Sequence, residues 1–220
     1  MTKVFNLKAD IEHAVRLYPG LWISEIENKF IIQGDIELIH PTHNSVLDTF
    51  SIEIFYPDRF PFCFPKVIET ENKIERSADR HINVKENNTL CLAVPPEEQL
   101  LTRNGISTVW FIKNVLLPRL AEEYEVNRGG KYTREYSHGL DGYWEFYFKK
   151  LKTNDPAFVI NTIESALNQN LPKGSYNCPC GSGKKFKKCH RNAFYEIGYL
   201  NVLDKKKLAL TLTAFKSKSI

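Results

Sequence analysis

The 220-residue sequence has no run of about 18 consecutive apolar residues, which excludes an ordinary membrane-spanning helix. It lacks a secretory-signal pattern, because Asp10 and Glu12 come before any apolar core. It also has no internal repeat and no low-complexity tract. With 42% hydrophobic and 25% charged residues, its composition is typical of globular proteins, and we expect a soluble, cytoplasmic protein.

Cysteine is scarce and unevenly distributed. The chain has five cysteines, an odd number that does not suit a complete disulfide framework. Cys63 and Cys91 lie in the first half of the chain, and the other three lie close together near its end. This clustering favours a metal site over disulfide bonds, as expected for a cytoplasmic protein.

Positive charge is concentrated in the same terminal region. From Leu171 onward, eleven Lys and Arg residues stand against only Glu196 and Asp204, so this part carries a net charge of +9 and residues 1–170 carry −5. The two parts of the chain therefore favour different partners.

Hydrophobic periodicity outlines the secondary structure. Apolar residues at helical spacing predict a helix within residues 3–18, and later alternation predicts a meander of half-buried strands. Prolines at positions 57, 61 and 65 make a stiff, extended segment. Ser107 suits the N-cap of an apolar helix from Thr108 to about Glu123, and Asp155 precedes a further helix. The predicted strands are 21–26, 30–38, 50–55 and 67–68.

The segment His81–Cys91, HINVKENNTLC, places a single cysteine where a polar loop meets apolar residues. A thiol held at such a place can accept or give an acyl group as a thioester, and the amide of Asn83 can donate a hydrogen bond to the oxyanion that forms. The opposing interpretation is that Cys91 is one more small core residue, since unpaired cysteine is often buried.

The order of segments around this cysteine resembles the ubiquitin-conjugating (UBC) fold over roughly residues 1–150. That family has a strand, a proline-rich turn, a second strand, a His-Pro-Asn motif, and a catalytic cysteine eight residues after the Asn. Here the turn lies at Tyr56–Pro57, the motif reads His81–Ile82–Asn83, and the cysteine follows at position 91. Ile82 departs from the motif's proline, which leaves the rigidity of the loop open. Bacterial members of the superfamily tolerate such changes, so the resemblance implies a divergent prokaryotic version.

The resemblance implies that Cys91 receives the C-terminal glycine of a ubiquitin-like modifier, or of another protein with a glycine-ended C-terminus, from a separate activating enzyme and passes it to an acceptor protein. Asn83 would stabilise the oxyanion or hold the loop in shape, and His81 would orient the loop through a hydrogen bond. His138 resembles the His-Gly pair of bacterial UBC-like proteins. It is either a base or orienting group at Cys91 or only part of a helix-capping turn. By family analogy, such proteins serve ubiquitin-like modification or antiviral defence in bacteria.

Residues 178–190 read CPCGSGKKFKKCH and supply three thiols and one imidazole, the ligand types that zinc prefers. Gly181 and Gly183 let the chain fold back so that both ligand pairs reach one ion. We therefore predict a structural Zn²⁺ site with a closed coordination shell, in which metal binding provides most of the module's folding free energy. The predicted ligands are Cys178, Cys180, Cys189 and His190.

This string resembles the SEC-C motif, a short zinc module best known from the C-terminus of the bacterial preprotein translocase ATPase. Its lysines would offset the thiolate charge and form a basic face suited to an acidic protein surface or to nucleic acid. Docking to a protein is the favoured alternative, because few aromatic residues nearby could stack on bases. Those aromatic residues are Phe186, Phe194, Tyr195 and Tyr199.

These patterns predict an α+β fold, with a UBC-like antiparallel meander sheet flanked by helices and a small C-terminal zinc-binding module. The expected domains are a conjugating domain with its C-terminal helices (1–168), a linker (169–177), the zinc module (178–191) and a basic, helical tail (192–220). Two other functions stay open. One is a non-catalytic UBC-like adaptor that binds a ubiquitin-like tail, and the other is a basic zinc protein that binds nucleic acid.

Overall fold

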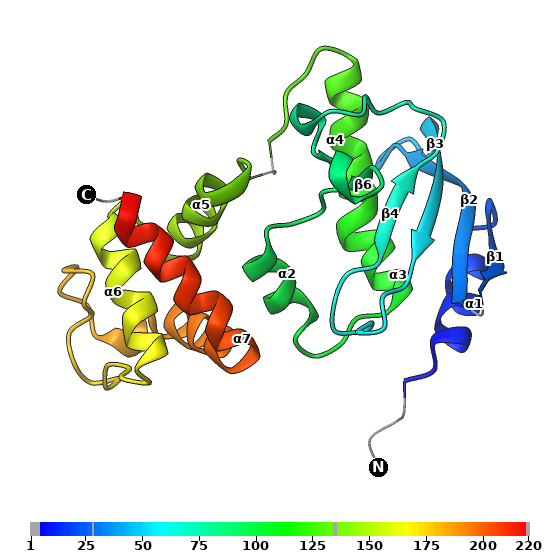
Figure 1. Cartoon of the computed structure of the whole chain (residues 1–220). Coiled ribbons are helices and arrows are strands. Elements are labelled where there is room, and N and C mark those ends of the chain that lie inside the picture. Colours follow the sequence, from blue (N-terminus) through cyan, green and yellow to red (C-terminus); the bar gives the residue numbers. More distant parts are fainter. Residues whose placement is uncertain (1–4, 28, 134–135, 219–220) are drawn as a thin grey trace. The chain divides into compact units, whose positions relative to one another are not determined.

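The computed structural model describes residues 5–27, 29–133 and 136–218 (Figure 1). Residue contacts divide the chain into two compact units. The first comprises Met1–Ala93 and Leu101–Glu135, and the second comprises Val94–Leu100 and Tyr136–Ile220. The domain prediction placed residues up to 168 with the conjugating domain, whereas the helices from residue 139 to residue 167 share a core with the zinc-ligand region. We therefore describe each unit by itself.

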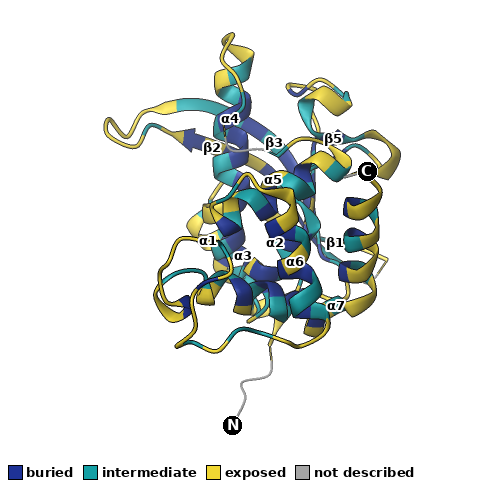
Figure 2. Cartoon of the chain, turned by 90° about the vertical axis from the view of Figure 1, so that its left-hand side faces the viewer, coloured by how far each residue is buried: buried dark blue, intermediate teal, exposed yellow. Residues whose placement is uncertain are grey.

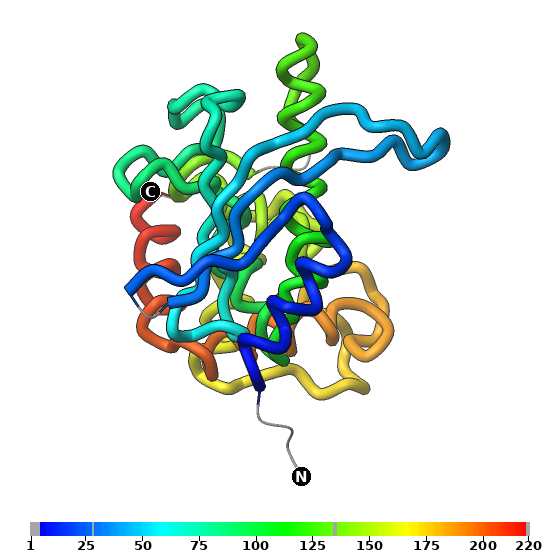
Figure 3. The backbone as a smooth tube through the Cα atoms, turned by 90° about the vertical axis from the view of Figure 1, so that its right-hand side faces the viewer, coloured from blue at the N-terminus to red at the C-terminus, as the bar shows by residue number. Residues whose placement is uncertain are grey.

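The first unit is built on a four-stranded antiparallel sheet in which each strand pairs with the next one along the chain. This is the predicted meander. Figure 3 shows the strands side by side, with the β2–β3 hairpin reaching beyond the rest of the sheet. The strands are β1 (Leu21–Ile26), β2 (Lys29–Ile39), β3 (Val46–Phe55) and β4 (Lys66–Glu69).

Glycine is required at one point of this sheet. Gly34 pairs with Leu21 and has φ +127°, a conformation that residues with a side chain rarely adopt. A Cβ atom there would lie 2.3 Å from the carbonyl oxygen of Gly20 and 2.5 Å from the ring of Trp22. The absent side chain thus lets the ring of Trp22 lie directly against the backbone of β2.

Two helical stretches flank the strands in the sequence. α1 (Leu7–Leu17) begins after Asn6, whose side chain accepts a hydrogen bond from the backbone N–H of Ala9. The second stretch follows Cys91 and consists of α3 (Thr108–Phe111), a π-helical segment (Ile112–Leu116) and α4 (Leu117–Asn127). Ser107 Oγ accepts a hydrogen bond from the N–H of Trp110 at 3.1 Å, which confirms the predicted N-cap.

Pro118 does not end this second stretch. The residue lies in the first turn of α4, directly after the π-helical segment. Proline cannot donate an intrahelical hydrogen bond and its ring crowds the preceding turn, so the wider π turn lets the helix continue past it. The chain therefore changes its helix type locally before the proline and stays helical through it.

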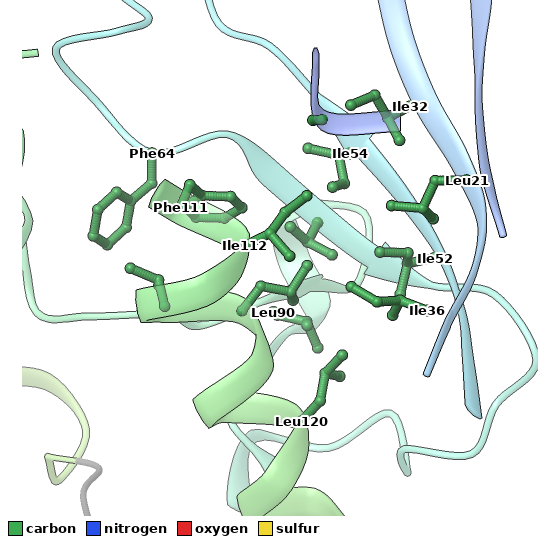
Figure 4. Packing of buried hydrophobic residues seen from close by; sticks show 14 of the residues in the cluster. Leu21, Ile32, Ile36, Ile52, Ile54, Phe64, Leu90, Phe111, Ile112 and Leu120 are labelled. Atoms are coloured by element: carbon green, nitrogen blue, oxygen red, sulfur yellow. The ribbon is translucent and has the colours of Figure 1, made fainter. Parts of the chain in front are cut away.

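The core of the first unit lies between the sheet and this helix. Figure 4 shows Ile52 and Ile54 of β3 pointing toward Phe111 and Ile112. Each of these four side chains is almost fully buried, and such burial contributes roughly 1.5–3 kcal/mol per side chain. The same core takes up the short β5–β6 hairpin, which consists of β5 (Ile82–Asn83) and β6 (Thr89–Leu90). Short 3₁₀ helices precede and follow β5 at Ala78–Arg80 and Val84–Glu86.

The second unit is helical. Figure 2 shows the buried residues of α7 gathered along one side of the helix. α7 breaks at Asp204, which has φ −155° and whose carboxylate accepts a hydrogen bond from the N–H of Lys207 at 2.9 Å. None of the described helices combines the length and the apolar character that crossing a membrane requires. The helices of this unit are α5 (Gly139–Leu151), α6 (Pro156–Leu167), the 3₁₀ helix Phe186–Lys188 and α7 (Arg191–Lys218), together with residues 95–100 of α2 (Pro95–Thr102), whose last two residues belong to the first unit.

Candidate thiol and metal sites

The β5–β6 hairpin fixes the position of Cys91. Ile82 pairs with Leu90, and both side chains are 4% exposed in the core of the first unit. Asn83 pairs with Thr89, so these two side chains lie on the opposite face of the hairpin, and Cys91 directly follows β6. The hairpin therefore brings Asn83 into the same short segment of structure that ends at Cys91.

A backbone hydrogen bond and a side-chain hydrogen bond link the two sides of the hairpin. The N–H of Cys91 donates to the carbonyl oxygen of His81 at 2.8 Å, and the Nδ2 of Asn83 donates to Thr89 Oγ1 at 3.4 Å. His81 itself has φ +50°, and its ring meets the ring of Tyr132 edge to face. The thiol of Cys91 is free and its residue is half-buried, so it is both fixed and accessible.

A buried cluster of charged side chains ties the loop before this hairpin to α4. Glu123 is fully buried and forms ion pairs with Arg80 and with Arg119, whose Nη1 lies 2.5 Å from Glu123 Oε1. The hydroxyl of Tyr132 donates to the same carboxylate at 2.5 Å. Arg119 also donates from Nη2 to the carbonyl oxygen of Arg80 at 2.8 Å. The segment that leads into His81 is therefore held by both charge and hydrogen bonds.

Burial and the neighbouring charges determine the protonation states of Glu123 and Tyr132. Burial alone would raise the pKa of Glu123, but the charge of Arg119 and hydrogen bonds from its neighbours bring it below its ordinary value. Burial and the hydrogen bond to Glu123 raise the pKa of Tyr132 to about 12. At neutral pH the carboxylate is therefore charged and the phenol keeps the proton that it donates.

Sequence reasoning missed this cluster because Arg80 and Glu123 lie far apart in the chain. One signal was available. Glu123 follows Leu116 by seven positions and Leu120 by three, so it falls on the apolar face of its helix. A carboxylate at such a position needs a buried partner of opposite charge.

His138 is the N-cap residue of α5, which agrees with the prediction of a capping turn before this helix. It is exposed, and its side chain makes no capping hydrogen bond. His138 belongs to the second unit and Cys91 to the first. A contact between the two residues therefore stays a prediction.

The four predicted metal ligands come together in the second unit. The ligand atoms of Cys178, Cys180, Cys189 and His190 all lie within 4.8 Å of one another. His190 Nδ1 lies 3.3 Å from the Sγ of Cys178 and 3.2 Å from the Sγ of Cys189. The sulfurs of Cys180 and Cys189 are 3.6 Å apart. Four donor atoms thus surround one point.

This geometry fits a zinc ion. Tetrahedral zinc, at about 2.3 Å from sulfur and about 2.0 Å from nitrogen, needs donor atoms roughly 3.5–3.8 Å apart. The three separations given above, 3.3, 3.2 and 3.6 Å, are close to these tetrahedral donor–donor distances. His190 Nε2 lies 2.7 Å from the carbonyl oxygen of Leu151, and this hydrogen bond orients the ring so that Nδ1 faces the thiols.

The chain folds back around the cluster as predicted. Gly181 and Gly183 both have positive φ, and the N–H of Cys178 donates to the carbonyl oxygen of Lys184 at 2.8 Å. Burial raises the pKa of Cys178 to about 11, whereas hydrogen bonds from Ser182 and the other thiols outweigh burial and lower that of Cys180 to about 6. A bound metal ion would favour the thiolate form of Cys178 and so offset the effect of burial.

Comparison with known proteins identifies the motif. Residues 177–192 match the SEC-C motif, so the chain carries this motif. The chain is also similar to the protein translocase subunit SecA of Campylobacter lari (strain RM2100 / D67 / ATCC BAA-1060), with 39% identity over 59 residues. That alignment covers 24% of this chain and only 7% of the relative. No solved structure matches the chain significantly.

Proposed function

We propose that this chain is a UBC-like conjugating protein that carries a ubiquitin-like modifier as a thioester on Cys91 and transfers it to an acceptor protein. The observation that carries the proposal is the free, half-buried thiol that directly follows the β5–β6 hairpin, whose first strand contains Asn83. One face of this hairpin lies in the core, so the thiol is held in place although Ile82 stands where the family has proline.

The architecture of the first unit supports the proposal. An N-terminal helix comes first, and a four-stranded antiparallel meander follows, with the proline-rich segment between β3 and β4. The β5–β6 hairpin then leads to the cysteine, and a long helical stretch comes after it. This is the order that the resemblance to the UBC family implies. The buried cluster around Glu123 supplies the loop anchoring that the missing proline would otherwise provide.

The chemistry follows from these positions. The Cys91 thiolate attacks the thioester carbonyl that joins the modifier's terminal glycine to the activating enzyme, a new C–S bond forms, and the thiolate of that enzyme leaves. An acceptor amine then attacks the same carbonyl, Cys91 leaves as a thiolate, and the amine proton passes to a base or to solvent.

Each of these steps develops an oxyanion, to which Asn83 Nδ2 can donate. Its present bond to Thr89 is long at 3.4 Å and therefore replaceable. Loss of one such donor typically slows a reaction about 10²–10³-fold. His81 acts on the thiol through its carbonyl, which holds the N–H of Cys91.

Intact mass spectrometry tests the proposal. The protein is co-expressed with its neighbouring genes and measured with and without a reducing thiol, as wild type, Cys91→Ser and Cys91→Ala. We expect a thiol-labile adduct on the wild type, a thiol-resistant ester or no adduct on the serine variant, and none on the alanine variant. Cys63→Ser is the matched control, because this second half-buried thiol of the first unit should not affect the adduct.

The opposite result is equally informative. If an activating enzyme and a glycine-ended modifier are present and the wild type still carries no adduct, the conjugating function is wrong. Binding of the modifier that persists in Cys91→Ala would then indicate the non-catalytic adaptor.

A further inference from the structure

The zinc-ligand region carries an uncompensated basic surface. The chain has no acidic residue from Ser165 to Tyr195. In the described parts of the chain, none of the six exposed cations of this stretch forms an ion pair, whereas Lys150, Lys216 and Lys218 of the same unit each pair with a carboxylate. The six cations are Lys173, Lys184, Lys185, Lys187, Lys188 and Arg191.

Bound zinc does not neutralise this charge. Three thiolates and one Zn²⁺ together carry a single negative charge, so a net charge of +5 remains on this stretch. The nearest carboxylates in the sequence are Glu164 and Glu196, and each already pairs with a lysine. Such a surface attracts a polyanion.

Two exposed tyrosines lie within the basic surface. Tyr176 is 58% exposed and has Lys173 Nζ 5.8 Å from its ring centroid. Tyr195 is 53% exposed and has the Arg191 guanidinium 5.4 Å from its ring centroid. Each ring thus has a cation beside it, a pairing that lets a base stack while its phosphate meets the positive charge.

The structure also corrects the aromatic residues that the sequence suggested for stacking. Phe186 and Phe194 are 1% and 2% exposed in the core of the second unit, so neither can meet a base. Tyr195 stays available, and Tyr176, which the sequence analysis did not include, joins it.

Hydrogen bonds hold Tyr176 beside the lysines. Its carbonyl oxygen accepts from the N–H of Phe186 at 2.8 Å, and the carbonyl of Gly174 accepts from the N–H of Lys187 at 3.1 Å. Tyr195 is the fifth residue of α7 and follows the predicted ligand His190 by five positions. Backbone hydrogen bonds thus hold Tyr176 beside the basic loop, and the start of α7 keeps Tyr195 close to the predicted metal ligands.

From this arrangement we infer that the zinc module is a binding site for single-stranded nucleic acid. The lysines contact backbone phosphates, and unstacked bases lie against Tyr176 and Tyr195. A duplex keeps its bases stacked and cannot use the two rings. An acidic protein segment can use the charges but does not need the rings. The site is independent of the thioester chemistry, so Cys91→Ala retains it.

Fluorescence anisotropy with a labelled, mixed-sequence RNA of about 16 nucleotides tests the inference on the full, zinc-loaded chain. Four phosphate contacts on a single strand give a log–log salt slope of about −2.8, which is roughly 50-fold weaker binding at 200 mM than at 50 mM salt. Tyr176→Ala and Tyr195→Ala should each weaken binding about 5- to 150-fold. Both residues are exposed, so zinc content and circular dichroism should stay unchanged in these variants.

A matched pair of charge variants completes the design. The first changes four lysines of the module to glutamine and should remove most of the binding. The second removes the same charge at four exposed lysines elsewhere in the chain and should change the affinity by less than about 3-fold. The module variant carries changes at Lys184, Lys185, Lys187 and Lys188, and the control at Lys8, Lys113, Lys205 and Lys206.

Three outcomes would overturn the inference. The first is no detectable binding of the RNA at 50 mM salt. The second is equal binding of the RNA and a duplex of the same length. The third is binding that both tyrosine variants leave unchanged and that polyglutamate competes for equally well, which would assign the surface to an acidic protein partner.

Discussion

Replacing Glu123 with glutamine should destabilise the first unit by about 3 kcal/mol at neutral pH. Glu123 is fully buried, and the side chain of its partner Arg119 is only 4% exposed. Removing one member of a buried ion pair leaves the other charge without compensation, which typically costs about 3–5 kcal/mol. We expect the lower end because the glutamine oxygen can still accept the hydrogen bond from Tyr132.

The assay is urea unfolding followed by tryptophan fluorescence in a Trp144→Phe background. The two remaining tryptophans, Trp22 and Trp110, both lie in the first unit, so the signal reports that unit alone. Glu125→Gln is the matched control, because Glu125 is exposed on the same helix and its loss should change the free energy of unfolding by less than about 0.5 kcal/mol.

The effect should depend on pH in one direction. The folded-state pKa of Glu123 lies below its ordinary value of about 4.3, so around that pH the unfolded chain binds more protons. The stability contributed by the charge is present above that value and is lost as the pH falls through the folded-state pKa. A Glu123→Gln loss no larger than that of Glu125→Gln, or one that persists in full in strong acid, would refute the reasoning.

Three further predictions concern stability and metal content. Removal of the metal with a chelator, or Cys178→Ser, should reduce the far-ultraviolet circular dichroism of the helical second unit, whereas Cys63→Ser should leave the zinc content by elemental analysis unchanged. Gly34→Ala should lower the free energy of unfolding by at least about 2 kcal/mol because backbone atoms would clash, whereas Gly129→Ala, which has positive φ but open space around it, should cost only about 1 kcal/mol. Ser107→Ala should cost about 1 kcal/mol in thermal unfolding, through loss of the N-cap hydrogen bond.

The features that could be predicted from the sequence depend on residues that lie close together in the chain. Alternation located β1–β3 to within a few residues, and the hydroxyl of Ser107 with the apolar pattern behind it located the start of α3. The metal cluster was also predictable, because thiol and imidazole ligands at short spacing have few other uses.

The features that could not be predicted from the sequence depend on contacts between residues that lie far apart in the chain. The apolar faces of α5 and α6 suit either core, so sequence alone could not decide that they pack with the zinc-ligand region. The ion pair between Arg80 and Glu123 joins residues separated by 43 positions. The burial of Phe186 and Phe194, which removes both as stacking residues, follows from tertiary packing.

The metal cluster is continuous with the core of the second unit, since Cys178 and Phe186 are buried in that core and His190 bonds to the last residue of α5. A zinc ion that binds the folded unit and not the unfolded chain stabilises it by mass action, by about 2.7 kcal/mol at 100 times the dissociation constant and about 4.1 kcal/mol at 1,000 times. The folded population of this unit would then follow the free zinc concentration of its surroundings. A unit of this kind would report metal scarcity by unfolding.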